Sequence, residues 1–223
     1  MEELPEIILV DKPKGITSYD VIRLLKHTLP RGTKIGHAGT LDPLASGLMI
    51  IGIGRGTKRL TEFLKLPKVY TADVLLGRRT STGDLEGEVL EERPLTSQSL
   101  SDWDVRKTVA GMCGTLELQV PAYSAVKVGG QPLYKRARRG DTSITPPIKT
   151  MQVARAELLE HFAHEHGYVL RVEFAVGSGT YIRSLAEELG RRFNLPATLA
   201  DLRRTIIGEF RIEDARPMEN FHS

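Results

Sequence analysis

Short apolar runs alternate with amphipathic stretches along this chain. Residues 7–10 form an apolar run typical of a buried strand, and the apolar positions between residues 21 and 29 recur at helical spacing. A Thr-Ser-Tyr-Asp capping box at 17–20 marks the start of that helix. Residues 168–176 alternate with period two and place their apolar side chains on one face, which predicts a half-covered antiparallel strand.

The same patterns predict the other elements and the fold class. Because strands and helices mix without strict β-α-β alternation, the pattern favours an α+β fold. Neither an internal repeat nor a Pro- or Ser-rich linker divides the chain, so we expect a single domain over residues 1–223. The further strands are expected at 48–53, 69–76, 85–92, 115–120, 149–158 and 206–212, and the further helices at 57–64, 102–110, 133–139 and 180–192.

Residues 121–147 differ from the rest of the chain in composition. Gly, Pro, Tyr and basic residues are frequent there, which predicts an irregular excursion with one short helix. Long segments of this kind in a compact domain usually bind something. We therefore expect a binding role for the excursion.

Composition and charge exclude several classes of protein. With 223 residues, 40% hydrophobic and 26% charged, the chain is neither disordered nor collagen-like. The net charge of +3 permits a nucleic-acid partner without requiring one. Cys113 is the only cysteine, so an intrachain disulfide and a cysteine-based zinc site are both excluded. The start lacks a secretory signal pattern, and the longest apolar run is far shorter than the roughly 20 residues that a bilayer requires. We expect a cytoplasmic protein.

Three motifs suggest chemistry that their spacing does not support. The glycines around Lys58 match neither a Walker loop nor a dinucleotide fingerprint, because Thr57 stands where each pattern needs glycine. Gly177-Ser178-Gly179 lacks the glycines two residues from the serine that a nucleophile elbow requires. His161, His164 and His166 could ligate a metal, but a solvated turn between strands is favoured.

The most informative segment is the loop Gly-His-Ala-Gly-Thr-Leu-Asp-Pro-Leu-Ala-Ser-Gly at 36–47. It places Asp42 next to Pro43 in a glycine-rich loop that leads directly into a buried strand. Such a loop can hold a carboxylate rigidly and close to a ligand. An aspartate before a proline is also a common turn residue, so the loop by itself leaves its role open.

This loop closely resembles the catalytic loop of the bacterial TruB-type tRNA pseudouridine-55 synthases, with Ala38 where that family usually has Thr. Seven further segments match in the same order over about 200 residues, which chance does not produce. The matching segments are 10–15, 68–70, 80–87, 120–127, 133–138, 179–183 and 202–205.

The resemblance implies a pseudouridine synthase fold, with a mixed, mostly antiparallel sheet flanked by helices and RNA-binding loops. It also implies an isomerase that needs no metal or cofactor: the N1–C1′ bond of uridine breaks, C5 bonds to C1′, and the C5 proton leaves. Asp42 is the implied catalytic carboxylate, and the Arg183 guanidinium is implied to favour its ionised form. Tyr70 is implied to stack on the extruded base and to assist removal of the C5 proton.

Four further positions of the resemblance are implied to contact the substrate. Tyr181 and Leu202 correspond to residues that line the pocket, His37 to one that contacts RNA near the flipped base, and Lys12 to one beside the site. Without the resemblance, Tyr70 and Leu202 would be ordinary core residues and His37 a polar loop residue.

The resemblance also implies a partner, the T-arm stem-loop of tRNA. A folded T-arm is recognised by shape and backbone, which suits dispersed basic pairs. Four basic clusters are expected to face phosphates: Arg78-Arg79, Lys135 to Arg139, Arg191-Arg192 and Arg203-Arg204. Many family members carry a C-terminal PUA-type RNA-binding domain, which we expect to be absent here.

We expect a monomer that requires no protein partner. Two alternatives remain open from the sequence: a non-catalytic RNA-binding protein on the same scaffold, and an enzyme acting on free nucleosides or sugars.

Overall fold

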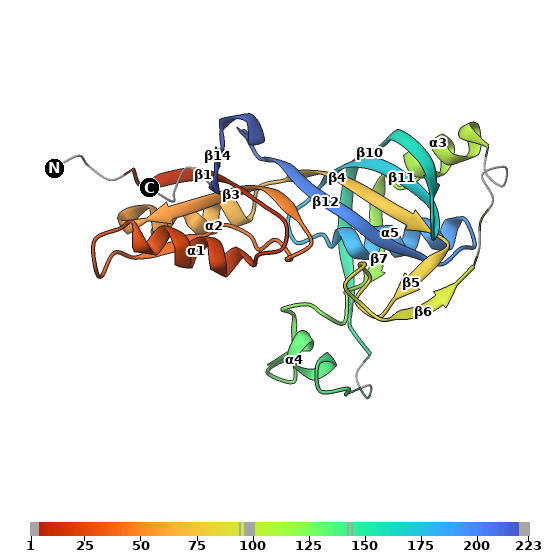
Figure 1. Cartoon of the computed structure of the whole chain (residues 1–223), viewed down its shortest axis with the longest axis horizontal. Coiled ribbons are helices and arrows are strands. Elements are labelled where there is room, and N and C mark those ends of the chain that lie inside the picture. The colour runs from red at the N-terminus through yellow and green to blue at the C-terminus, as the bar shows by residue number, and fades with distance from the viewer. Residues whose placement is uncertain (1–4, 94, 96–100, 142, 144, 219–223) are drawn as a thin grey trace. The chain divides into compact units, whose positions relative to one another are not determined.

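The computed structural model describes residues 5–93, 95, 101–141, 143 and 145–218. Tertiary contacts divide the chain into two compact units: Met1–Thr71 with Leu202–Ser223, here called the terminal unit, and Ala72–Asp201, called the central unit. Two strands, β4 (Lys68–Leu76) and β12 (Ala197–Ile207), pass from one unit into the other (Figure 1). The single domain expected from the sequence stays a prediction.

The terminal unit is built around strand β3 (Ser46–Ile53), whose residues are all buried. β1 (Ile7–Lys12) pairs antiparallel with β3, and β12 pairs parallel with it, which gives the order β14-β1-β3-β12. β2 (Ile35–His37) is also antiparallel to β3. The smaller elements of this unit are η1 (Gly54–Arg59), α2 (Leu60–Leu64), β13 (Phe210–Arg211), η2 (Ile212–Asp214) and β14 (Arg216–Pro217).

Helix α1 (Ser18–His27) begins where the capping box predicted. The Thr17 hydroxyl accepts from the amide of Asp20 at 3.1 Å, and the Asp20 carboxylate accepts from the amide of Thr17 at 2.9 Å. Both halves of the capping box are therefore present, and they satisfy amides that the helix itself leaves unpaired. Apolar side chains of the helix and the strands form the core of this unit, with Val21, Ile22, Leu25, Leu48, Ile50, Phe63 and Ile207 buried.

The central unit has the strand order β4-β11-β10-β7. β10 (Ile148–His164) pairs antiparallel with both β11 (Gly167–Val176) and β7 (Gly114–Gln119). In β11 the residues from Leu170 to Val176 alternate between buried and half-buried, as the period of two predicted. The other elements are β5 (Arg78–Thr80), β6 (Val89–Glu92), α3 (Asp102–Ala110), β8 (Lys127–Val128), β9 (Gln131–Pro132), α4 (Leu133–Ala137) and α5 (Ile182–Arg192).

Two expectations in this unit are wrong. The strand expected at 85–92 is shorter and spans Val89–Glu92, because 81–87 folds as a turn. The turn expected at His161, His164 and His166 is confined to residues 165–166, because His161 and His164 continue strand β10. There the His161 ring bonds the Tyr168 hydroxyl and the Asp102 carboxylate, at 2.6 and 2.9 Å.

The excursion at 121–147, of which residues 142 and 144 lie outside the described part, contains the predicted short helix as α4. The β8–β9 hairpin precedes that helix, and Figure 1 shows this segment extending from the end of β7. Among the described residues, no helix is long and apolar enough to cross a bilayer.

Candidate active site

The loop with Asp42 connects β2 to β3 in the terminal unit, and contacts from distant segments hold its backbone. The Ser18 hydroxyl donates to the carbonyl of Leu41 at 3.0 Å and accepts from the amide of Leu41 at 2.8 Å. On the other side, the amide of Gly15 donates to the carbonyl of Pro43 at 2.9 Å. The residues before and after Asp42 are therefore both fixed, which limits where its carboxylate can lie.

Lys12 stabilises the turn that contacts this loop. Its side chain is completely buried, and its ammonium donates to the carbonyls of Pro13 and Ile16, at 2.9 and 2.7 Å. These bonds close the turn that contains Gly15, which in turn holds Pro43. The contacts of Lys12 thus support a role in shaping the loop.

His37 ends strand β2, five residues before Asp42. Burial lowers the pKa of the imidazole, and the positive charge of Arg204 lowers it further. Among the described residues, no group hydrogen-bonds its buried Nδ1 atom. A neutral imidazole with an unused nitrogen can still bond a ligand, because each ring nitrogen is a donor or an acceptor.

Tyr70 and Leu202 are buried in the terminal unit, on β4 and β12, and are 8% and 7% exposed. The two strands are joined nearby, where the Thr205 hydroxyl donates to the carbonyl of Val69 at 3.3 Å. Both side chains are thus held on paired strands. In such a position Tyr70 can form a flat wall of a pocket and Leu202 an apolar one.

Arg183 and Tyr181 belong to the central unit, at the start of α5. The Arg183 side chain is buried and donates to the carbonyls of Thr82 and Tyr123, at 2.9 and 3.0 Å. Its Nη1 atom also lies 3.6 Å from the buried carboxylate of Asp84. A buried arginine held at several points keeps one orientation, unlike a surface cation.

Sequence reasoning missed Asp84 as a partner of Arg183. Asp84 has no role in the site predicted from the sequence, although it lies in one of the segments that resemble the family. The Asp84 carboxylate also accepts from the Thr82 hydroxyl and from the amide of Glu86, which fixes the turn around it. The sequence feature that could have indicated this partner is a carboxylate within a turn that is rich in Gly and Thr.

Tyr181 precedes α5 as its N-cap residue. The Lys149 ammonium lies 5.8 Å from the centre of its ring and donates to the carbonyl of Gly179 at 3.2 Å. A cation over an aromatic face stabilises the ring position by about 0.5–1 kcal/mol at exposed sites. Of the seven predicted site residues, five belong to the terminal unit and only Tyr181 and Arg183 to the central unit.

The basic pairs expected to face RNA are largely engaged within the protein. Arg204 is 1% exposed, so the expectation that it faces phosphates is wrong. Its neighbour Arg203 binds Asp11 at 2.7 Å. The remaining contacts are Arg78 with Glu92, Arg79 with Glu91, and Arg191 and Arg192 with Glu188.

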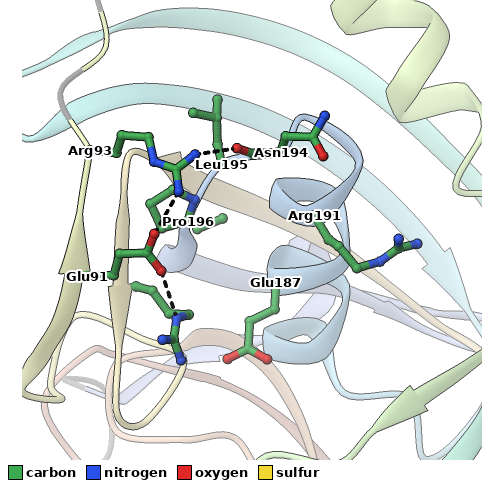
Figure 2. A pocket seen from close by; sticks show the side chains of 9 residues that line it. Glu91, Arg93, Glu187, Arg191, Asn194, Leu195 and Pro196 are labelled. Atoms are coloured by element: carbon green, nitrogen blue, oxygen red, sulfur yellow. Dashed lines mark hydrogen bonds and ion pairs between the residues drawn. The ribbon is translucent and has the colours of Figure 1, made fainter.

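An open hollow of about 290 Å³ lies on the central unit, and none of the predicted site residues lines it (Figure 2). Arg93 donates there to the carbonyl of Asn194 and to the carboxylate of Glu91, both at 2.9 Å, and Arg79 lies 3.6 Å from the same carboxylate. The arginines that line the hollow are therefore already paired.

Solved structures share the fold of this chain. A chain from an H/ACA RNP bound to a substrate RNA containing 2'-deoxyuridine superposes with a TM-score of 0.67 and 23% identity, over 96% of this chain and 51% of that one. At this identity the similarity concerns the fold alone.

Curated proteins are similar over nearly the whole chain. The tRNA pseudouridine synthase B of Corynebacterium aurimucosum is 39% identical over 213 residues, which are 96% of this chain and 70% of that protein. The tRNA pseudouridine synthase B of Lactobacillus delbrueckii is 40% identical over 216 residues, which are 96% and 72% of the two chains. Residues 26–182 match the model of the TruB family pseudouridylate synthase N-terminal domain. With that match across most of its length, the chain belongs to the TruB family of pseudouridylate synthases.

Proposed function

We propose that this protein isomerises uridine to pseudouridine at position 55 in the T-loop of tRNA. The observation that carries the proposal is the identity of 39–40% over 96% of the chain to proteins named tRNA pseudouridine synthase B. The rigid loop around Asp42 supports it from the structure, because a reacting carboxylate must be held in one place.

The reaction exchanges one glycosidic bond for another without a redox change. The N1–C1′ bond breaks, the base turns, C5 bonds to C1′, the C5 proton passes to water, and N1 takes up a proton. Asp42 begins this sequence by attacking C1′ or C6, or by removing the C2′ proton, and each route requires an ionised carboxylate.

The target base must leave the RNA stack before it can react. Unstacking a base costs a few kcal/mol, and each stacking contact with an aromatic side chain returns about 1–3 kcal/mol. Tyr70 and Tyr181 are the proposed aromatic surfaces, and Leu202 the proposed apolar wall. In this proposal Tyr70 also assists removal of the C5 proton, and His37 contacts the RNA near the flipped base.

Arg183 is the second proposed catalytic residue and supplies the positive charge that the family resemblance implies for the reacting carboxylate. Its bonds to the carbonyls of Thr82 and Tyr123 support the proposal, because they leave the guanidinium one orientation. Arg183→Lys keeps the charge but not the planar fork, so we expect it to lower kcat.

The excursion at 121–147 is the proposed contact with the T-arm backbone. Lys135, Arg138 and Arg139 are exposed on and after α4. Exposed cations on an extended segment suit phosphates, whose recognition depends on charge more than on sequence. In this proposal the reaction takes place in the cytoplasm and the protein acts as a monomer.

A T-arm stem-loop that carries tritium at uridine C5 tests this function. Wild-type protein should release tritium to water, and Asp42→Asn should abolish release while RNA binding persists. Asp214→Asn, at an exposed carboxylate of the same unit, is the matched control and should behave like wild type. A wild-type protein that binds the RNA without releasing tritium would support the non-catalytic alternative instead.

The salt dependence of binding separates RNA from smaller substrates. Each phosphate contact lowers log K in proportion to log salt, with a slope of about 0.7–0.9 per contact. A steep slope is expected for the T-arm. An enzyme acting on free nucleosides would show almost none.

A further inference from the structure

Arg204 is the most deeply buried arginine of the terminal unit, and its side chain reaches the loop that carries Asp42. It is 1% exposed. Its Nε atom donates to the carbonyl of Leu48 at 2.7 Å, and its Nη2 atom donates to the carbonyl of Gly39 at 3.1 Å. Gly39 precedes Asp42 in the loop and Leu48 follows it in strand β3, so one guanidinium binds the chain on both sides of Asp42.

The backbone of Arg204 approaches the same segment. Arg204 pairs with Gly47 in the parallel ladder between β12 and β3. A Cβ atom at Gly47 would lie 2.3 Å from the carbonyl oxygen of Arg204, and the φ of Gly47 is +111°. The strand therefore abuts the end of the loop closely, and side chain and backbone together hold residues 39, 47 and 48.

Stabilisation of the fold does not by itself explain why the charged side chain of Arg204 is buried. Among the described residues, no carboxylate lies within 4.0 Å of the Arg204 guanidinium, and its hydrogen-bond partners are neutral carbonyls. Burial lowers the pKa of His37 and of Lys68, and the charge of Arg204 lowers both further because it repels their charged forms. A buried charge without a counter-ion destabilises the folded state, and an apolar side chain could fill the same space without that desolvation.

We propose that Arg204 is a positioning residue, a buried clamp that joins Gly39 of the 36–47 loop to Leu48 of β3 and thereby fixes the carboxylate of Asp42 for reaction. The inference rests on the proposed function, since it needs Asp42 to react. The neighbouring Arg203 does not join the two sides of Asp42 in this way: its guanidinium binds the Asp11 carboxylate and contacts the loop only at the Ser46 hydroxyl, at 3.3 Å.

Turnover and binding of tRNA by Arg204→Met and Arg204→Lys test the clamp. In Arg204→Met the loop loses both bonds, and a displacement of about 1 Å at a reacting group can lower a rate about 100-fold. We expect kcat for tritium release to fall by about that factor, with the dissociation constant of the T-arm within about threefold of wild type. Arg204→Lys keeps a donor but cannot span both carbonyls, so its kcat should be intermediate.

Arg171→Met is the matched control for a loss of fold. Arg171 binds the buried Asp73 carboxylate through Nε and Nη2, at 2.7 and 2.8 Å, within the central unit. Its loss should lower the melting temperature and leave the kcat of the folded protein unchanged.

Each outcome separates the clamp from the proposed function. An inactive wild-type protein overturns the proposed function. An active wild type with an equally active Arg204→Met overturns the clamp, and so does a loss of binding that matches the loss of kcat. If Arg204→Met does not fold, Arg204→Lys decides: wild-type kcat in that variant contradicts the clamp, and a lowered kcat with unchanged binding supports it.

Discussion

The hydroxyl of Ser18 makes two hydrogen bonds to the backbone of Leu41, one as donor at 3.0 Å and one as acceptor at 2.8 Å. Ser18 is the first residue of α1, and Leu41 immediately precedes Asp42. The capping box that starts the helix therefore also sets the place of the serine that holds the loop. Helix initiation and the position of the candidate catalytic carboxylate are coupled through these two residues.

Ser18→Ala should destabilise the protein and slow turnover together. The substitution removes both bonds and leaves the buried amide of Leu41 without its acceptor, which costs about 1–3 kcal/mol. Urea denaturation would measure the loss, and tritium release would measure the effect on kcat. Thr33→Ala is the control, because the Thr33 hydroxyl bonds the carbonyl of Pro30 in an exposed loop. Equal effects of the two substitutions would show that the Ser18 bonds do not matter.

Gly47→Ala should be far more damaging than the same change at another glycine with positive φ. The new methyl group at position 47 would lie 2.3 Å from the Arg204 carbonyl oxygen and 2.7 Å from its amide nitrogen, so β12 would have to move away from β3. At Gly32, with φ +88°, nothing lies within 4 Å of the new atom. Gly32→Ala should therefore cost only the conformational strain of about 1–2 kcal/mol.

Thermal unfolding of the two alanine variants compares them directly. A Gly47→Ala protein as stable as Gly32→Ala would contradict the close packing of β12 against the loop.

The sequence predicted best those elements whose local signals agree with their surroundings. The helix at 102–110 is observed with the same bounds, and the pseudouridine synthase fold implied by the resemblance is confirmed. Strand β12 spans Ala197–Ile207, whereas the sequence predicts a strand only at 206–212, because the two arginines at 203–204 are residues that buried strands rarely carry. A buried strand can carry Arg204 because backbone carbonyls from another segment accept its hydrogen bonds, and local patterns do not reveal such partners.

The candidate site could be predicted only in part for the same reason. The loop at 36–47 was found from its residues and from the resemblance, but the contacts that hold it come from Ser18, Gly15 and Arg204. Likewise Arg183 was found, whereas its partner Asp84 was not, since 99 residues separate them. Tertiary hydrogen bonds of this kind join residues that are far apart in the chain and follow no common periodic pattern. The pattern of a single sequence therefore does not predict which residues bond to each other.

His37 should make the stability of the protein depend on pH below neutrality. Burial, assisted by the charge of Arg204, lowers the pKa of His37 in the folded state. As the pH falls below the ordinary value of about 6.5, the unfolded chain takes up a proton that the folded chain does not. The contribution of His37 to the free energy of unfolding is therefore present above that pH and is lost as the pH falls below it. The loss is no more than about 1.4 kcal/mol per pH unit.

Urea denaturation at pH 7.5 and 5.5 measures this contribution in wild type and in His37→Asn. The variant should lose less stability than wild type between the two pH values. His27→Asn, at an exposed histidine of α1, serves as control and should follow wild type. Parallel curves for wild type and His37→Asn would refute the assignment.

Lys135→Ala tests whether the excursion touches RNA phosphates. Lys135 is exposed on α4, where Arg136 is already bound to Asp141 at 2.6 Å and Arg138 lies over the ring of Tyr134. Removing one phosphate contact should weaken T-arm binding and reduce the slope of log K against log salt by about 0.7–0.9. The control is Lys107→Ala, which removes another exposed lysine, from α3. Because both substitutions change the net charge by one, a non-specific attraction would respond equally to either. An unchanged slope in Lys135→Ala, or equal changes in both variants, would remove the excursion from the RNA interface.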